Sequence, residues 1–237
     1  MNKGAEFWIT DILEVSPYER LEPRDSMKFL PGQIYWGPIR YPLKEFKILR
    51  EVLSERDDWQ GKYVFELIRY STKSPPNIPL KIGDLSLKSD EYLFVTPGKT
   101  RPFISLGETQ TGWFGNEKIV LGIPIFRFKV RHTQEFVMRI QAFDYPWLFY
   151  IKPDKKNGIE EGAARLELIQ FIPKGHCQPF KVPTPEGRFP IKLSEYNYKV
   201  LWYQLHKFMH GVPLSEELEE AISVYKSILL DKIQHLK

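Results

Sequence analysis

Short strand-like segments occupy most of the chain between residues 98 and 173 and restrict the folds open to it. They are rich in branched and aromatic residues and are bounded by Gly, Pro or Asn, which is typical of strands joined by turns. The five segments are RPFISLG, KIVLGIPIFRF, EFVMRIQAF, PWLFYI and AARLELIQFIP. In EFVMRIQAF every second residue from Phe136 to Ala142 is apolar, which predicts a half-buried antiparallel strand. Five strands in 76 residues predict a small barrel, because closure removes unpaired strand edges.

The C-terminal part of the chain has a helical pattern instead. LSEYNYKVLWYQLHKFMHG (193–211) begins with Ser194 as an N-cap, ends at Gly211 and carries apolar residues at helical spacing between them. Ser215 caps a second predicted helix, whose apolar face consists of Leu218, Ile222, Tyr225, Leu229, Ile233 and Leu236. The sequence therefore predicts a helical hairpin, joined to the barrel by a proline-rich connector that packs against it.

The residues before 98 give weaker patterns. Residues 1–29 are mixed, and SPYERLEPRDS reads as an extended lead-in outside the core, whereas PGQIYWGPIRYP (31–42) predicts a short aromatic strand between turns. Apolar residues at helical spacing predict a helix over 43–59. The segments 62–70 and 90–97 read as strands.

Composition and charge narrow the class of protein. The longest apolar runs, such as WLFYI, fall far below the ~20 residues that span a bilayer. The first residues lack a signal-peptide core, so we expect a cytoplasmic protein without a membrane partner. The single Cys177 excludes an internal disulfide and a multi-cysteine metal site. The net charge is +4, and residues 98–132 carry six basic against two acidic residues, which indicates either an anionic partner or a solvated sheet face.

Several kinds of catalytic site lack their motifs. His206 and His210 have the spacing of two zinc ligands, but Lys207 replaces the glutamate of the metalloprotease pattern, and helix-surface histidines explain the pair. A metal-dependent nuclease needs an Asp followed by Glu-x-Lys on adjacent strands, which the sequence does not offer, so a DNA-cutting enzyme has little support. A phosphate-binding glycine loop and a nucleophile elbow around Ser105 are also missing. We predict no metal and no cofactor.

Pro102 indicates where two of the basic residues lie. Because proline has no N–H to donate, it belongs at the first residue of a strand or on an edge. Lys99 and Arg101 are therefore predicted at the rim of the sheet, where RPFISLG begins to pair. A rim arginine either pairs with a loop carboxylate or meets an anionic ligand.

The order of four segments resembles that of a known family. PGQIYWGPI, KTRPFISLG, IVLGIPIF and AARLELIQFIP follow one another. They are similar to the GDIWW, RPVVV, VAPIT and LDQIRTI segments of the PemK/MazF toxin endoribonucleases. The stretch from Arg139 to Gly175 further resembles long PemK-like proteins with the same helical tail. The match covers residues 31–40 and 98–180.

The resemblance implies a fold that is mainly β with α, an SH3-like small barrel of the PemK/MazF type with an insertion and a C-terminal helical hairpin. The expected segments are an N-terminal extension (1–29), the barrel (30–180) with its insertion at 40–97, and the connector with the helical hairpin (181–237). The family forms homodimers, binds single-stranded RNA and is inhibited by an antitoxin protein, so these are the expected partners.

The resemblance also implies metal-independent RNA cleavage. In the family a base helps the 2′-hydroxyl attack the adjacent phosphate, and an arginine that matches Arg101 stabilises the transition state. A guanidinium suits this role because it stays charged and binds phosphate oxygens in pairs. The expected RNA-binding residues are Lys99, Phe126, Arg127, Lys129 and Arg131.

One departure from the family leaves two functions open. Phe126 stands where the family has a Ser or Thr hydroxyl, and a phenyl ring cannot move a proton. His132 or Thr133 would then supply the acid or base, since the pKa of an ordinary histidine lies near ~6.5. The protein is therefore expected to be either an endoribonuclease toxin or a catalytically inactive barrel that binds RNA or a protein, with Phe126 stacking on a base.

Overall fold

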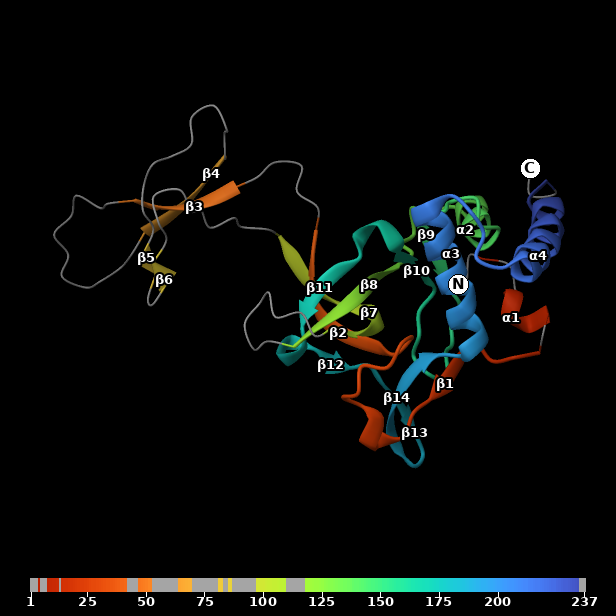
Figure 1. Ribbon diagram of the computed structural model, residues 1–237, viewed down its shortest axis with the longest axis horizontal. Helices are drawn as coiled ribbons and strands as arrows, with labels where there is room; N and C mark the ends of the chain where they lie inside the picture. Colours follow the sequence, from red (N-terminus) through yellow and green to blue (C-terminus); the bar gives the residue numbers. More distant parts are fainter. Residues whose placement is uncertain are drawn as a thin grey trace. The chain divides into compact units, whose positions relative to one another are not determined.

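The computed structural model describes residue 4 and residues 8–12, 14–41, 47–52, 64–69, 81–82, 85–86, 97–109 and 118–234 (Figure 1). The chain forms two compact units. The first contains Met1–Ile39 and Thr100–Lys237, and the second contains Arg40–Lys99.

The second unit contains two pairs of short strands. β3 (Lys47–Val52) pairs antiparallel with β4 (Val64–Arg69), and β5 (Lys81–Ile82) with β6 (Leu85–Ser86). β4 confirms the strand predicted at 62–70. The helix predicted at 43–59 is wrong where β3 lies, because pairing along all six residues of VFELIR overrides the helical spacing. The strand predicted at 90–97 lies, apart from Pro97, outside the described residues.

The first unit is built on a seven-stranded sheet. Its strands, in spatial order, are β12 (Gln178–Pro179), β2 (Ile34–Arg40), β7 (Gly98–Thr109), β8 (Ile119–Arg127), β10 (Gly162–Arg165) and β9 (Leu148–Ile151), with β11 (Gln170–Pro173) also paired to β8. These strands confirm the predicted β segments at 31–42, 101–107, 118–128 and 146–151. The fold is mainly β with helices, as expected.

β8 has partners along both of its edges. β7 pairs with one edge, while the other edge pairs with β11 over Ile119–Gly122 and with β10 over Ile125–Arg127. AARLELIQFIP is therefore two strands and not the single strand predicted. A 3-10 turn, η3 (Leu166–Leu168), separates them because the chain must step from one half of β8 to the other.

The described strands do not close into a barrel. The spatial order of the sheet ends at β12 on one side and at β9 on the other, and no pairing among the described residues joins these two strands. The SH3-like barrel is therefore not confirmed.

The strand predicted at 135–143 is wrong, because these residues form helix α2 (Gln134–Gln141). Thr133 caps it, and its hydroxyl accepts a hydrogen bond from the Phe136 N–H at 3.2 Å. Val137, Ile140 and Gln141 are buried at the i, i+3, i+4 spacing of one helix face. Thr133, three residues before Phe136, is a possible N-cap and so indicates a helix, but the alternation of apolar residues in EFVMRIQAF favoured a strand.

A second sheet contains parts of the chain that the sequence placed outside the core. β1 (Tyr18–Arg20) and β13 (Lys181–Thr184) both pair antiparallel with β14 (Gly187–Leu193). The proline-rich connector therefore contributes a hairpin. The N-terminal lead-in is also part of the core, since Trp8, Tyr18 and Phe29 are buried.

The predicted helical hairpin is confirmed. α3 (Glu195–His210) begins after Ser194, whose hydroxyl accepts from the Asn197 N–H, and ends at Gly211, which has φ +74°. α4 (Glu216–Gln234) follows, and Ile222, Tyr225, Leu229 and Ile233 of its predicted face are buried.

Trp8 anchors the hairpin to the rest of the first unit. It precedes the short helix α1 (Ile9–Ile12), its indole N–H donates to Asn197 Oδ1 at 3.0 Å, and its ring lies edge-on to Tyr225 at 5.6 Å. Figure 1 shows α2, α3 and α4 at the end of this unit away from β11 and β12. No helix in the described part of the chain is long and apolar enough to cross a membrane.

The Phe103 ring fills the space left by two glycines on the neighbouring strands. A Cβ on Gly37 of β2 would lie 2.8 Å from this ring, and a Cβ on Gly122 of β8 would lie 2.5 Å from it. Phe103 itself is completely buried. Glycine at these positions is therefore required for β2, β7 and β8 to approach around one aromatic side chain.

We expect Gly122→Ala to destabilise the protein by ~1–3 kcal/mol, because the added methyl group overpacks the core against Phe103. Urea denaturation measures this change. Gly175→Ala is the matched control, since nothing lies within 4 Å of the added Cβ. Equal stability of the two variants would contradict this account of the packing.

Candidate nucleic-acid interface

The pairing of β7 with β8 places Arg101 against Phe126. Phe103 pairs with Pro124, so the residues two positions before Phe103 and two after Pro124 face each other across the antiparallel strands. The Arg101 guanidinium carbon lies 4.7 Å from the centroid of the Phe126 ring. Pro102 comes directly before the first residue with a partner on β8, although β7 itself begins at Gly98.

A second guanidinium reaches the same ring from β10. Ala163 pairs with Phe126, and Arg165, two residues further on, lies on the same face with its guanidinium carbon 5.3 Å from the ring centroid. Each cation–π contact of this kind contributes ~0.5–2 kcal/mol. The Arg165 Nε also donates to Glu167 Oε1 at 2.7 Å, so a carboxylate balances part of its charge.

A cleft of about 410 Å³ opens beside these side chains, and we call it the Arg101–Phe126 cleft. Its cationic lining residues are Arg101, Arg127, Lys129, Arg131 and Arg165. Its aromatic lining residues are Phe126, Phe128, His132, Phe136 and Trp147. The described residues that line it include no Asp or Glu. The cleft therefore combines positive charge with ring faces.

The structure brings six of the predicted site residues together. Arg101, Phe126, Arg127, Lys129, Arg131 and His132 all line the cleft. Lys99 is exposed and belongs to the second unit. Thr133 is not among the described lining residues and caps α2.

Sequence reasoning missed Arg165, Phe128, Phe136 and Trp147. Phe136 was assigned to a strand, and Arg165 lay in the middle of a segment read as one continuous strand. Arg165 is a single basic residue after two alanines in the sequence. This pattern indicates a site residue only once it is known that the strand ends at Arg165 and a 3-10 turn begins at Leu166.

His132 is held in one orientation within the cleft. Its Nδ1 accepts a hydrogen bond from the Lys129 backbone N–H at 2.9 Å, so its neutral ring carries the proton on Nε2. The imidazole stacks on Phe136 with ring centroids 5.5 Å apart and meets Phe128 edge-on at 5.6 Å. The lone pair on Nδ1 is therefore the proton acceptor of this neutral ring, and Nε2–H is its proton donor.

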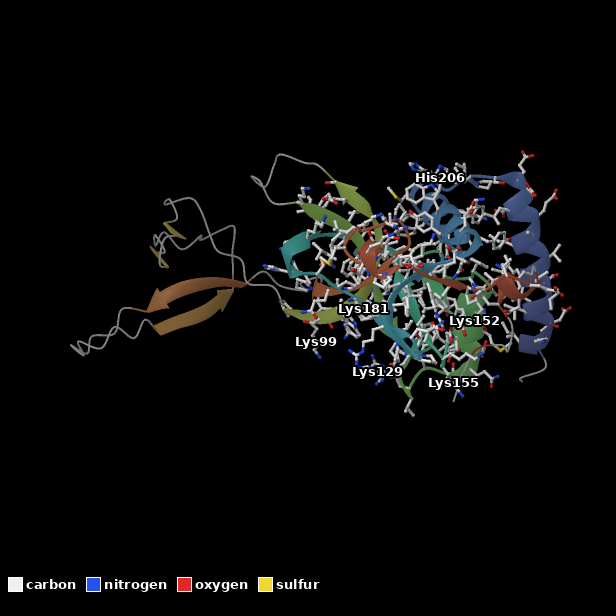
Figure 2. The ribbon with its side chains drawn as sticks, turned by 90° about the horizontal axis from the view of Figure 1, so that it is seen from below. Lys99, Lys129, Lys152, Lys155, Lys181 and His206 are labelled. Carbon is white, nitrogen blue, oxygen red and sulfur yellow. The ribbon has the colours of Figure 1, made fainter. Side chains whose placement is uncertain are left out.

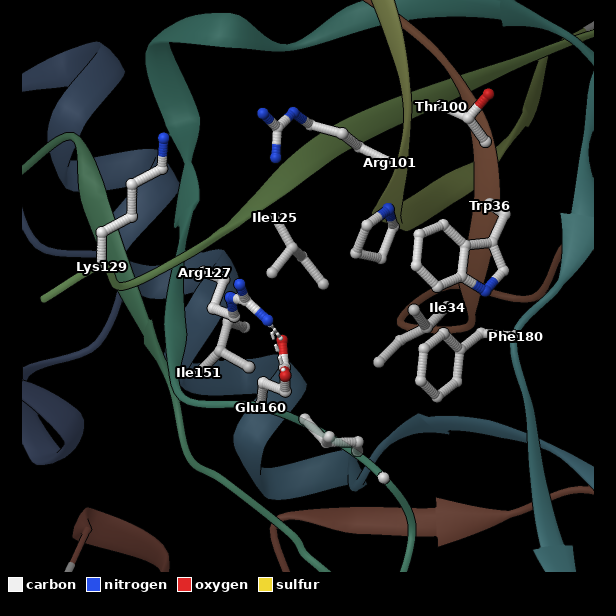
Figure 3. A pocket seen from close by; sticks show the side chains of 13 residues that line it. Ile34, Trp36, Thr100, Arg101, Ile125, Arg127, Lys129, Ile151, Glu160 and Phe180 are labelled. Atoms are coloured by element: carbon white, nitrogen blue, oxygen red, sulfur yellow. Dashed lines mark hydrogen bonds and ion pairs between the residues drawn. The ribbon is translucent and has the colours of Figure 1, made fainter. Parts of the chain in front are cut away.

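A neighbouring cavity of about 400 Å³ shares Arg101, Arg127 and Lys129 with the cleft (Figure 3). Arg127 Nη1 donates to both carboxylate oxygens of Glu160, at 2.8 and 2.9 Å. Both side chains are more than 60% exposed, at 65% and 62%. An ion pair so exposed contributes ~0–1 kcal/mol, so a ligand can reorganise it at little cost.

Hydrogen bonds to the buried Glu161 fix the segment that carries Glu160. The neighbouring Glu161 accepts from the Tyr150 hydroxyl at 2.7 Å and from the Gly4 N–H at 2.8 Å. Burial, and then the charge of Glu161, raise the pKa of Tyr150 far above its ordinary value, so the hydroxyl remains a donor. The Phe128 N–H donates to the Glu161 carbonyl at 3.1 Å and ties this segment to the end of β8.

The two helical histidines lie apart from the cleft. Figure 2 shows His206 on the opposite side of the first unit from Lys129 and Lys155. The His206 and His210 rings are 4.6 Å apart, and His206 Nδ1 lies 3.2 Å from the Val212 carbonyl oxygen. Across the residues that the structure describes, no group of three or more His, Cys, Asp or Glu side chains could hold a metal ion.

Comparison with protein-family models, with curated proteins and with solved structures finds no match. The resemblance to the PemK/MazF family therefore stays a prediction. A function for this chain is therefore inferred from the residues that line the Arg101–Phe126 cleft.

We expect Thr133→Ala to destabilise the protein by ~1 kcal/mol, because α2 loses its N-cap. Thr133→Ser is the control, since it keeps the hydroxyl that accepts from Phe136 N–H. Urea denaturation compares the two variants with the wild type. If Thr133→Ala leaves the free energy of unfolding unchanged, the cap is not what holds the start of α2.

Proposed function

We propose that the Arg101–Phe126 cleft binds single-stranded RNA. The observation that carries the proposal is one aromatic ring contacted by two guanidinium groups, in a cleft with five cationic lining residues and no acidic one among those described. Guanidinium groups bind phosphate oxygens through paired, charge-assisted hydrogen bonds, and aromatic rings stack on bases. The cleft offers both kinds of contact within one nucleotide's reach.

The size of the cleft favours a single strand over a duplex. A cavity of about 410 Å³ holds a base with its sugar and phosphate, and only an unpaired base can turn its face toward Phe126 or Trp147. Base stacking on an aromatic side chain contributes ~1–3 kcal/mol per base. Trp147 lines the cleft and is 40% exposed, so part of its side chain is accessible to a base.

The proposal includes the PemK/MazF relationship. Arg101 and Phe126 are the residues of the Arg-Pro and Ile-Pro-Ile-Phe segments that carry the resemblance, and they meet in space. β8 changes its partner along one edge from β11 to β10, which is compatible with the curved sheet of an SH3-like barrel. A homodimer and an antitoxin partner belong to the same proposal.

Metal-independent RNA cleavage is the second candidate function. His132 lines the same cleft as Arg101, which favours it. In this reaction His132 acts as the base, because the lone pair on Nδ1 of its neutral ring exchanges the Lys129 hydrogen bond for the 2′-hydroxyl proton. The 2′-oxygen then attacks phosphorus, and Arg101 stabilises the added negative charge. The protonated His132 gives a proton to the 5′-oxygen as its bond to phosphorus breaks, which leaves a 2′,3′-cyclic phosphate and a 5′-hydroxyl.

We expect Arg101→Ala to weaken binding of a fluorescein-labelled hexauridylate by about tenfold or more, because a charge-assisted phosphate contact is lost. Fluorescence anisotropy measures the affinity. Lys118→Ala is the matched control, since Lys118 belongs to the same basic stretch but is absent from the described lining of the cleft. Equal losses in both variants would point to diffuse charge attraction, and an absence of binding by the wild type at low salt would overturn the proposal.

We expect any cleavage to resist a chelator and to disappear in both Arg101→Ala and His132→Ala, because the reaction uses these side chains and no metal. Gel electrophoresis of a long unstructured RNA, with and without EDTA, measures this. His176→Ala serves as the control histidine variant, since His176 lies in the 3-10 helix η4 (Lys174–His176) and not in the described lining of the cleft. Intact RNA that remains bound would leave binding as the function and exclude the second candidate.

A further inference from the structure

The cavity beside the Arg101–Phe126 cleft has the features of a base-binding site. Trp36 and Phe180 stack with their ring centroids 5.7 Å apart and their planes 21° from parallel. Figure 3 shows these two rings on one side of the cavity and the Arg127–Glu160 pair on the other. We infer that this cavity binds a guanine base of the same RNA strand, and we call it the Trp36 pocket; the inference rests on the proposed function.

The Trp36 pocket is rigid where it meets the base. The Phe180 N–H donates to the Ile34 carbonyl at 3.0 Å, and Gln178 pairs with Trp36 across β12 and β2, so backbone contacts hold both rings in register. The floor consists of buried isoleucines, among them Ile34 and Ile151. Trp36 remains 39% exposed in a cavity that these isoleucines also line, so a flat ligand would bury it further.

The pocket is continuous with the cleft through its cations. Arg101, Arg127 and Lys129 line both cavities. A strand that places one base against Phe126 therefore keeps its phosphates beside these three side chains while the next base enters the Trp36 pocket. Because they share these cations, the Arg101–Phe126 cleft and the Trp36 pocket are suited to two successive nucleotides of one strand.

The Arg127–Glu160 pair selects guanine among the four bases. The Watson–Crick edge of guanine offers one acceptor, O6, followed by two donors, N1–H and N2–H. A guanidinium beside a carboxylate is complementary to that order, because Arg127 donates to O6 while Glu160 accepts from both donors. Adenine and cytosine present only one amino group to the carboxylate, and uracil places its single donor between two carbonyl oxygens.

The experiment compares labelled hexaribonucleotides, a uridine oligomer and two derivatives with a single central guanosine or adenosine, by fluorescence anisotropy. We expect the guanosine oligomer to bind about tenfold more tightly than the uridine one, which corresponds to ~1.4 kcal/mol. Trp36→Ala should remove this advantage. Glu160→Gln should lower the ratio of guanosine to adenosine affinity toward one, because the amide no longer accepts from two donors, and it should preserve uridine binding. Trp202→Ala is the control, since Trp202 lies on α3 and is likewise exposed, at 44%.

The outcomes separate this inference from the proposed function. Arg101-dependent binding of all three oligomers with no preference for guanosine, or a preference that survives Trp36→Ala, would overturn the Trp36 pocket and leave the cleft as the RNA site. No binding of any oligomer would overturn both. Thermal melting of Trp36→Ala and Glu160→Gln, compared with the wild type, verifies that the variants are folded. If Trp36→Ala is unfolded, Trp36→Phe replaces it. The inference is then overturned if the folded Trp36→Phe keeps the full preference for guanosine and Glu160→Gln also keeps the wild-type ratio of guanosine to adenosine affinity.

Discussion

The close approach of β10 to β8 is the constraint on which the site depends. Gly162 pairs with Arg127, and a Cβ on this glycine would collide with the carbonyl oxygen of Phe126. Only a residue without a side chain allows the two backbones to come so near. This pairing brings Arg165 to the face of β8 that Arg101 reaches from β7, and the Phe126 ring lies against both.

The five cationic side chains that line the Arg101–Phe126 cleft repel one another, and contacts at the edges of the cleft reduce this repulsion. Arg127 is paired with Glu160 and Arg165 with Glu167, while the Phe126 ring offers its electron-rich face to two guanidinium groups. The carboxylates are carried outside the described lining of the Arg101–Phe126 cleft. A polyanion in the cleft would relieve the remaining repulsion, which is the physical basis of the proposed RNA binding.

Much of the fold could be predicted from local patterns. Ser194, Gly211 and the apolar face of α4 define their helices through capping and periodicity alone, so these elements were predicted correctly. The helix over Gln134–Gln141 and the strand over Lys47–Val52 were not predicted correctly. A short segment whose apolar residues fit both helical and alternating spacing takes the structure that its neighbours in the fold stabilise. The burial of Trp8 and Tyr18 was also invisible, since their partners Asn197 and Leu193 are far away in the sequence.

The sequence by itself determined the residue types of the site: a basic stretch, an arginine before a proline, and a phenylalanine after Ile-Pro-Ile. Their chemistry follows from the side chains and needs no coordinates. Only the tertiary structure decided that Arg165, Phe136 and Trp147 join them, and that Trp36 and Phe180 form a second aromatic surface nearby. The reason is that strand pairing acts between residues distant in the chain, and no local pattern records which strands become neighbours.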